Sequence, residues 1–264
     1  MGVSLILGAV VGIIMGLTGA GGGILAVPLL VFGLHMTVAS AAPIGLLAVG
    51  IAAAMGAAFG LRAGVVRYRA ALLIALIGIL CNPLGLWLAL RMPVRYLTLL
   101  FAMVLFGVSA KGVREARLAG RQARQISACP CHLNSASGRL DWNIRCATRL
   151  SLMGAAAGIL SGLLGVGGGF VIVPALQHFS DLAMRSIVAT SLAVIALISL
   201  VSVAGTIHSG RFDLAQGLPF AVGATAGMLL GGRFAAKWKP EYLKLVFSLI
   251  CVAVACGLIG KTLY

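Results

Sequence analysis

Long stretches without charge are the feature that most limits how this chain can fold. No Asp, Glu, Lys or Arg precedes Arg62, and only 20 Lys or Arg and 5 Asp or Glu occur among 264 residues. This is about a third of the charged share of a typical soluble domain. The uncharged runs cover residues 1–61, 70–90, 96–110, 150–180, 186–210, 214–232 and 245–260. A helix needs about 20 apolar residues to cross a bilayer, so the chain is predicted to be an integral membrane protein.

The membrane spans are expected to be helices. Lipid offers no partner for unpaired backbone groups, and the runs do not alternate as barrel strands do. Glycine also recurs at every fourth position, as at Gly12 and Gly16 and again at Gly223, Gly227 and Gly231. Such spacing lets helices in lipid approach one another closely.

An internal repeat divides the chain. The 13 residues 16–28 align without gaps on residues 162–174, an offset of 146, and eight of the 13 positions are identical. Weaker matches follow at Gly64 and Gly210 and at Pro93 and Pro240. Such self-similarity indicates duplicated units. We therefore expect a first transmembrane repeat over 1–112, a basic loop over 113–148 and a second transmembrane repeat over 149–264.

Each repeat carries a Gly-Gly-Gly run inside an apolar stretch, with Pro28 or Pro174 five residues after it. Each glycine lowers the stability of a continuous helix by roughly 1 kcal/mol relative to alanine, and the proline adds an interruption. The stretch 3–34 is too long for one crossing and too short for two. The pattern predicts a glycine-broken helical hairpin, re-entrant or half-length, that turns near the midplane. Irregular backbone at that depth must be buried in protein or line a cavity.

The distribution of the 20 basic residues tests this hairpin. If both hairpins return to their side of entry, 16 basic residues share one face and four lie on the other; single crossings would give 13 and seven. The positive-inside rule favours the first arrangement. Three further helices in each half then make the two halves inverted repeats, an arrangement typical of secondary transporters. The central loop is expected in the cytoplasm and both termini in the periplasm of a multi-pass protein.

The net charge of +15 does not indicate a nucleic-acid partner, because the basic residues lie between apolar runs rather than on one helix face. Arg114, Arg117, Arg121 and Arg124 instead predict a helix face at the basic loop that contacts anionic lipid.

The glycine runs are the candidate substrate site. A helix beginning after each run presents unpaired N–H groups and about half a positive charge. Two such ends that meet predict a site for an anion; the alternative is that the glycines only permit tight packing. Four hydroxyls near these ends or at the starts of the next spans add donors. The candidate residues are Thr18, Gly21, Gly22, Gly23, Ser40, Gly167, Gly168, Gly169, Thr190 and Ser191.

Other chemistry is sparse. All five acids lie in or beside connections, whereas a proton relay or sodium site normally needs an intramembrane carboxylate. No paired acids and no nucleophile with a base are present, so catalysis and a bound cofactor are not expected. Asn82 beside Pro83 is suited either to line a pathway or to satisfy a kink.

The central loop holds one cysteine cluster. Cys129, Cys131 and His132, with Cys146 further along, offer donors for Zn²⁺ or Cu⁺, although their spacing matches none of the usual zinc patterns. The six cysteines do not form the dense spacing of a disulfide scaffold, so the thiols are expected to be reduced. These residues are weak metal candidates.

Three sequence elements stand out: the doubled motif Gly-Leu-x-Gly-x-Gly-Gly-Gly-x-x-x-Val-Pro, the sequence Ala-Thr-Ser-Leu at 189–192 and the sequence His-Ser-Gly-Arg-Phe-Asp at 208–213. Together they resemble the TauE/SafE sulfite exporter family of membrane permeases. The first half differs, with Ala-Ser-Ala-Ala at 39–42. The resemblance implies an inner-membrane carrier of sulfur-containing anions such as sulfite, sulfoacetate or other sulfonates.

The leading hypothesis is a permease that moves a small anion by alternating access around the two glycine hairpins. Two alternatives stay open: a non-transporting membrane assembly or sensor protein that acts through the Cys/His loop, and a metal-ion transporter. The latter needs acceptor side chains inside the membrane, and these are scarce. The sequence leaves the identity of the anion, the direction of transport, the coupling ion and the oligomeric state open.

Overall fold

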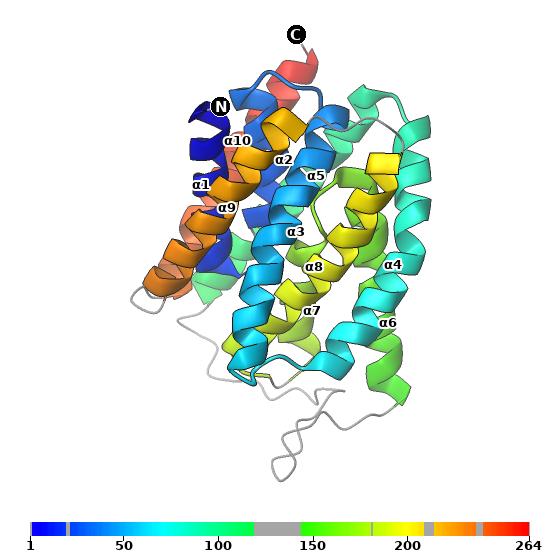
Figure 1. Cartoon of the computed structure of the whole chain (residues 1–264), viewed down its shortest axis with the longest axis vertical. Coiled ribbons are helices and arrows are strands. Elements are labelled where there is room, and N and C mark those ends of the chain that lie inside the picture. The colour runs from blue at the N-terminus through cyan, green and yellow to red at the C-terminus, as the bar shows by residue number, and fades with distance from the viewer. Residues whose placement is uncertain are drawn as a thin grey trace.

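Ten α-helices account for the secondary structure that the computed structural model describes (Figure 1). The described residues are 2–19, 22–118, 144–180, 182–208, 214–235 and 240–263. In chain order the helices are α1 (Gly2–Thr18), α2 (Gly22–Gly33), α3 (Val38–Arg62), α4 (Tyr68–Arg91), α5 (Val94–Leu118), α6 (Ile144–Leu164), α7 (Gly169–Phe179), α8 (Met184–His208), α9 (Leu214–Ala235) and α10 (Pro240–Leu263). Within these ranges there is no β-strand, which confirms the predicted all-α class.

Within the described part of the chain, four helices contain segments long and apolar enough to cross a membrane. These segments are Ser40–Arg62, Tyr68–Arg91, Cys146–Leu164 and Met184–Gly205. Shorter apolar helices cover Gly2–Thr18, Gly22–Gly33, Val94–Ala110 and Ser248–Gly260. Lengths and composition thus agree with a membrane-embedded bundle.

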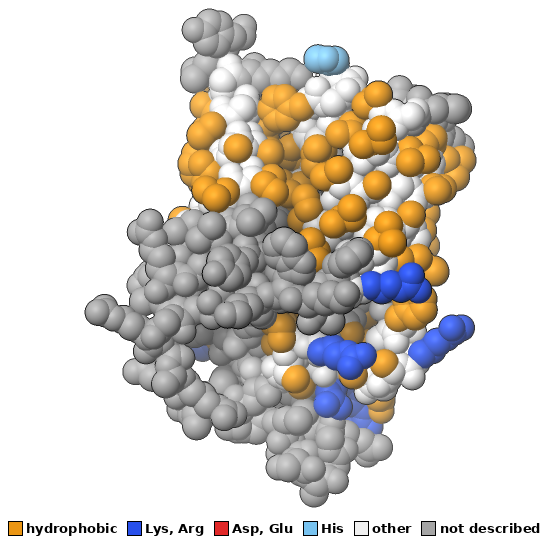
Figure 2. All heavy atoms as spheres, turned by 90° about the vertical axis from the view of Figure 1, so that its left-hand side faces the viewer, with side chains coloured by type: hydrophobic (Ala, Val, Ile, Leu, Met, Phe, Trp, Pro, Cys, Tyr) orange, Lys and Arg blue, Asp and Glu red, His pale blue; other side chains and the backbone are white. Residues whose placement is uncertain are grey.

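The outer surface is that of a protein in lipid. On α4, leucines at every fourth position form one stripe, since residues four apart share a helix face. These leucines are between 58% and 68% exposed: Leu72, Leu76, Leu80 and Leu84. Figure 2 shows apolar side chains over most of the described surface of one face, with the visible basic side chains gathered toward one end. An apolar belt with a basic end is the surface expected of a helical membrane protein.

The helix boundaries follow the sequence repeat. Helix α3 covers 38–62 and α8 covers 184–208, so both boundaries are shifted by 146 residues, and the ends of α1 at Thr18 and α6 at Leu164 show the same shift. The packing follows it as well: α1 packs along α9, as α6 packs along α4, while α3 packs along α8 and α5 along α10. If each helix is replaced by its equivalent in the other half (α1 by α6, α3 by α8, α4 by α9 and α5 by α10), the same set of packed pairs results.

Helices from both halves combine into two bundles. The first bundle contains α1, α2, α3 and α9, and the second contains α4, α6, α7 and α8. They join chiefly where α3 packs on α8. Helices α5 and α10 pack mainly against each other, and the Ser109 hydroxyl donates to the Ser248 carbonyl at 2.8 Å between them. Helix α1 begins and α10 ends at the same end of the molecule (Figure 1).

Glycine seams hold each bundle together. The position that a Cβ would occupy on Gly16 lies 2.5 Å from the carbonyl oxygen of Met228 on α9, and that of Gly154 lies 2.6 Å from the carbonyl oxygen of Ile74 on α4. Any larger residue would push the helix backbones apart. The seam glycines of α1 recur 146 residues later on α6: Gly8, Gly12 and Gly16 match Gly154, Gly158 and Gly162. The expected close approach of helices at these glycines is confirmed.

Candidate functional site

Both glycine runs end a helix in the same way. The N–H of Gly19 donates to the Met15 carbonyl at 2.8 Å, and the N–H of Gly165 donates to the Ser161 carbonyl at 2.9 Å. The φ angles are 86° at Gly19 and 69° at Gly165, a left-handed conformation that glycine adopts without steric cost. The predicted breaks therefore occur at equivalent positions of the two repeats. We call residues 19–21 the first break and 165–168 the second break.

The chain restarts as a short helix after each break. Gly167 and Gly168 have φ angles of 73° and 68°, and Gly168 is the N-cap of α7. The prolines, expected to add an interruption, do not: Pro28 lies inside α2 and Pro174 inside α7. A proline removes one backbone donor and kinks a helix, and tertiary packing of a short buried segment overrides that cost. The interruption comes from the glycines alone.

The first hairpin turns back on itself. The Cβ position of Gly22, at the start of α2, lies 2.6 Å from Met15 Cα, and that of Gly33, at its end, lies 3.3 Å from Leu7 Cδ2. Later residues of α2 thus meet earlier residues of α1, so the two helices are antiparallel. At 1.5 Å per residue, the 12 residues of α2 and 11 of α7 extend about 18 Å and 16 Å, roughly half of a bilayer core.

The start of α2 and the second break meet beside the middle of α3. The Cβ position of Gly23 lies 3.0 Å from the carbonyl oxygen of Val166 and 3.2 Å from Val49 Cγ1. The Cβ position of Gly167 lies 3.6 Å from the same Val49 methyl. Two segments far apart in sequence, each at the start of a half-length helix, are therefore brought together around one α3 side chain.

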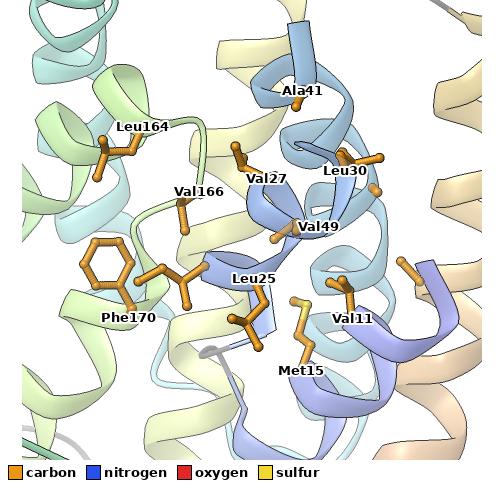
Figure 3. Packing of buried hydrophobic residues seen from close by; sticks show 14 of the residues in the cluster. Val11, Met15, Leu25, Val27, Leu30, Ala41, Val49, Leu164, Val166 and Phe170 are labelled. Atoms are coloured by element: carbon orange, nitrogen blue, oxygen red, sulfur yellow. The ribbon is translucent and has the colours of Figure 1, made fainter. Parts of the chain in front are cut away.

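Apolar side chains enclose this meeting point on the side of the first hairpin. Leu25, Val27 and Val49 are each 2% exposed or less, and they face Val166 and Phe170 of the second hairpin (Figure 3). The irregular backbone is thus buried in protein, the condition under which it is tolerated at membrane depth.

The predicted hydroxyl donors are engaged elsewhere. Thr18 donates to the Ile14 carbonyl of its own helix at 2.7 Å, and Ser191 donates to the Val188 carbonyl at 2.8 Å. Ser40 is exposed in the first turn of α3, 2.9 Å from the hydroxyl of Thr37. The Thr190 hydroxyl accepts the backbone N–H of Arg67 at 3.1 Å.

Of the predicted glycines, the structure brings Gly23 and Gly167 to the meeting point, with Gly22, Gly168 and Gly169 next to them in the chain. Gly21 lies outside the described residues.

Two serines that the sequence interpretation did not select lie at the second break. The hydroxyl oxygens of Ser161 and Ser199 are buried without a hydrogen-bond partner among the described residues. Ser199 Oγ lies 3.2 Å from the Cβ position of Gly167 and 3.7 Å from that of Gly50 on α3. Nothing in the sequence separates such a serine from one that bonds its own helix, so no signal was available to find them.

Comparison with known proteins decides the family. Residues 4–258 match the family described as "Sulfite exporter TauE/SafE". The chain belongs to the TauE/SafE family. This confirms the resemblance drawn from the doubled glycine motif, and it makes the protein a membrane transporter.

Individual relatives of this TauE/SafE transporter agree with that assignment. A "Probable membrane transporter protein" of Xylella fastidiosa (strain 9a5c) is 30% identical over 262 residues, which is 97% of this chain and 93% of the relative. The "Probable membrane transporter protein YunE" of Bacillus subtilis (strain 168) is 28% identical over 107 residues, 40% of this chain and 39% of YunE. No solved structure shows a significant match. These names state transport and give no substrate.

The remaining candidates of the TauE/SafE chain either make other contacts or lie outside the described residues. Asn82 donates its Nδ2 to the Gly158 carbonyl at 3.4 Å and so links α4 to α6. Cys129, Cys131 and His132 lie outside the described residues, which contain no group of three His, Cys, Asp or Glu suited to a metal. Cys146 is buried and disulfide-bonded, so the expectation of reduced thiols is wrong at this residue.

Proposed function

We propose that this TauE/SafE transporter carries a small sulfur-containing anion, such as sulfite or an organosulfonate, across the inner membrane. The anion is held where the start of α2 meets the second break. The observation that carries the proposal is the convergence of Gly23, Val166 and Gly167 around Val49. The helices α2 and α7 start here, and unpaired N–H groups at helix starts attract anions. Gly21, Gly22, Gly168 and Gly169 complete the proposed set of backbone contacts.

The proposed transport cycle is alternating access between the two bundles. Helices α3 and α8 are antiparallel, because Gly50 meets Ser199 whereas the later Gly60 meets the earlier Ala189. Helices α1 and α9 are parallel, since Gly8 meets Phe220 and Gly16 meets Met228. Antiparallel α3 and α8 support two inverted repeats, 1–112 and 149–264, joined by the loop 113–148. Rocking of one bundle against the other across α3 and α8 would open the site to alternate sides.

The proposed orientation places the loop 113–148 in the cytoplasm and both termini in the periplasm. Two contacts gather basic segments at one end of the molecule: the Arg67 N–H to Thr190, and Arg149 at 5.3 Å from the Phe179 ring. These contacts join the α3–α4 connection to the first turns of α8, and the start of α6 to the end of α7. Basic residues favour the cytoplasmic side and attract anionic lipid.

Counterflow in proteoliposomes tests the proposal. Purified full-length protein is loaded with sulfite, thiosulfate, sulfate or an organosulfonate, with and without a pH gradient. We expect saturable exchange of at least one sulfur anion, above protein-free liposomes. Absence of exchange for every anion in the panel would overturn the proposed function.

A further inference from the structure

Polar groups are unevenly divided between the two breaks. Ser161 and Ser199 of the second half correspond, at the offset of 146, to Met15 and Ala53 of the first half. All four residues are fully buried, at 0% exposure. The repeat therefore places hydroxyl groups beside one break and apolar groups at the matching positions beside the other.

The two serine hydroxyls behave differently from other hydroxyls in the helices. Seven described Ser or Thr hydroxyls donate to a carbonyl three or four residues earlier in their own helix: Thr18, Thr98, Thr148, Ser180, Ser191, Ser202 and Thr225. Ser161 and Ser199 have no such bond, nor any other partner among the described residues. A buried hydroxyl without a partner is unfavourable, and such groups in native structures call for a function or a missing ligand.

Ser199 lies at the centre of the molecule. It meets Gly50, which is midway between Val38 and Arg62 in α3. Its hydroxyl points toward Gly167, one residue before the N-cap of α7. Ser161 lies one turn before the second break, and its carbonyl accepts the N–H of Gly165. The Ser199 hydroxyl is thus beside the start of α7, and Ser161 lies in the last turn of α6 that leads into the second break.

We infer that the side chains of the site are one-sided: Ser199 and Ser161 donate hydrogen bonds to the oxyanion group of the substrate at the second break, while the first hairpin and α3 contribute only apolar side chains beside their backbone. This inference rests on the proposed function. Hydroxyl and backbone N–H groups are uncharged hydrogen-bond donors. They can therefore hold an oxyanion at a place that contains no buried cation. The side chains of Leu25, Val27 and Val49 offer no donor and contact the remainder of the substrate.

The test compares Ser199→Ala and Ser161→Ala with wild type in counterflow of sulfite, sulfate and ethanesulfonate. A lost hydrogen bond to a charged group raises the half-saturation concentration about tenfold. Ser202→Ala is the matched control, because this hydroxyl, three residues along the same helix, donates to Ile198. Ala53→Ser adds a hydroxyl at the position equivalent to Ser199, and we expect both controls to stay within about twofold of wild type.

A second readout measures binding without transport. The unfolding temperature of detergent-purified protein should rise with the transported anion in wild type and in Ser202→Ala, and much less in Ser199→Ala. If Ser199→Ala does not fold, Ser199→Cys keeps the side-chain volume with a weak donor, and a raised half-saturation concentration in that variant supports the inference.

Two results would overturn the inference and leave the proposed function intact. The first is a half-saturation concentration in the Ser199 variants equal to that of wild type. The second is an effect of Ala53→Ser as large as that of Ser199→Ala, which would indicate a symmetric site. A wild-type protein that responds to none of the anions overturns the proposed function, and the inference with it.

Discussion

The two breaks share a backbone but not a chemical environment. Gly19 and Gly165 cap their helices with the same hydrogen bond and the same left-handed conformation. Around them, Met15 and Ala53 occupy the places that Ser161 and Ser199 occupy in the other half. The motif residues thus give both hairpins the same shape, while positions outside the motif differ in the side chains that they place beside it. Backbone geometry and side-chain chemistry vary separately between the two repeats.

The largest expected effect comes from filling the second break. Gly168 has a φ angle of 68°, and its Cβ position lies 2.6 Å from the Ala157 carbonyl oxygen. Gly168→Val combines left-handed strain with a backbone clash and should cost about 2–5 kcal/mol and abolish counterflow. Denaturant unfolding of the purified variant measures the loss of stability, and counterflow in proteoliposomes measures the loss of transport.

Two glycines provide controls for Gly168→Val. Gly64 has the same φ angle of 68° with nothing near its Cβ position, and Gly107 has open space without a positive φ. We expect stability to decrease from Gly107→Val through Gly64→Val to Gly168→Val. Equal stability of the Gly64 and Gly168 variants would show that contact with Ala157 is unimportant.

A smaller effect separates the two breaks directly. The Cβ position of Gly19 meets the methyl groups of Val188, whereas that of Gly165 meets Ala42, including its Cα at 2.8 Å. Side-chain methyls can move and a helix backbone cannot. Gly165→Ala should therefore lower the free energy of unfolding by about 1–3 kcal/mol more than Gly19→Ala. Identical losses in denaturant titrations of the two variants would contradict this difference.

The seams that flank the breaks differ more modestly. Asn82 bonds the Gly158 carbonyl across the α4–α6 seam, while the equivalent residue on α9 is Met228. Removal of an interhelical hydrogen bond in lipid costs about 0.6 kcal/mol on average, so Asn82→Ala should destabilise slightly. Thr225→Ala, whose hydroxyl bonds its own helix, is the control for the α1–α9 seam. A larger loss in the Thr225 variant would argue against the polar seam.

The smallest expected effect concerns the central loop. Joint replacement of Cys129, Cys131 and Cys146 by serine removes the Cys146 disulfide and should lower the unfolding temperature, while counterflow stays within about twofold of wild type because the proposed site uses none of these residues. A sensor that acts through the Cys/His loop predicts the opposite. Loss of flux in a variant that is still folded at the assay temperature would favour that alternative.

Sequence patterns predicted the framework of this protein more completely than its site. Uncharged runs and the doubled motif indicate a helical membrane protein with two glycine breaks, because lipid and glycine impose strong local rules. Pro28 and Pro174 were expected to interrupt helices, yet tertiary packing keeps α2 and α7 continuous.

Side-chain roles were not predictable in the same way. Thr18 and Ser191 bond their own helices, and Thr190 accepts the Arg67 N–H across 123 positions of sequence. A hydroxyl in an apolar run has several partners within reach, and only the folded arrangement selects among them. For that reason Ser199 was missed, although it lies closer to the meeting point than Thr190 does.

The exchange of helices between bundles has a consequence for biosynthesis. Gly8 of α1 packs on Phe220 of α9, and Gly78 of α4 lies against Gly154 of α6. Neither half of the chain contains its own seam partner, so the α1 seam cannot form until α9 has been translated. If the two halves were produced as separate polypeptides, they would have to associate before either bundle could form. The two halves of the single chain therefore depend on each other for folding.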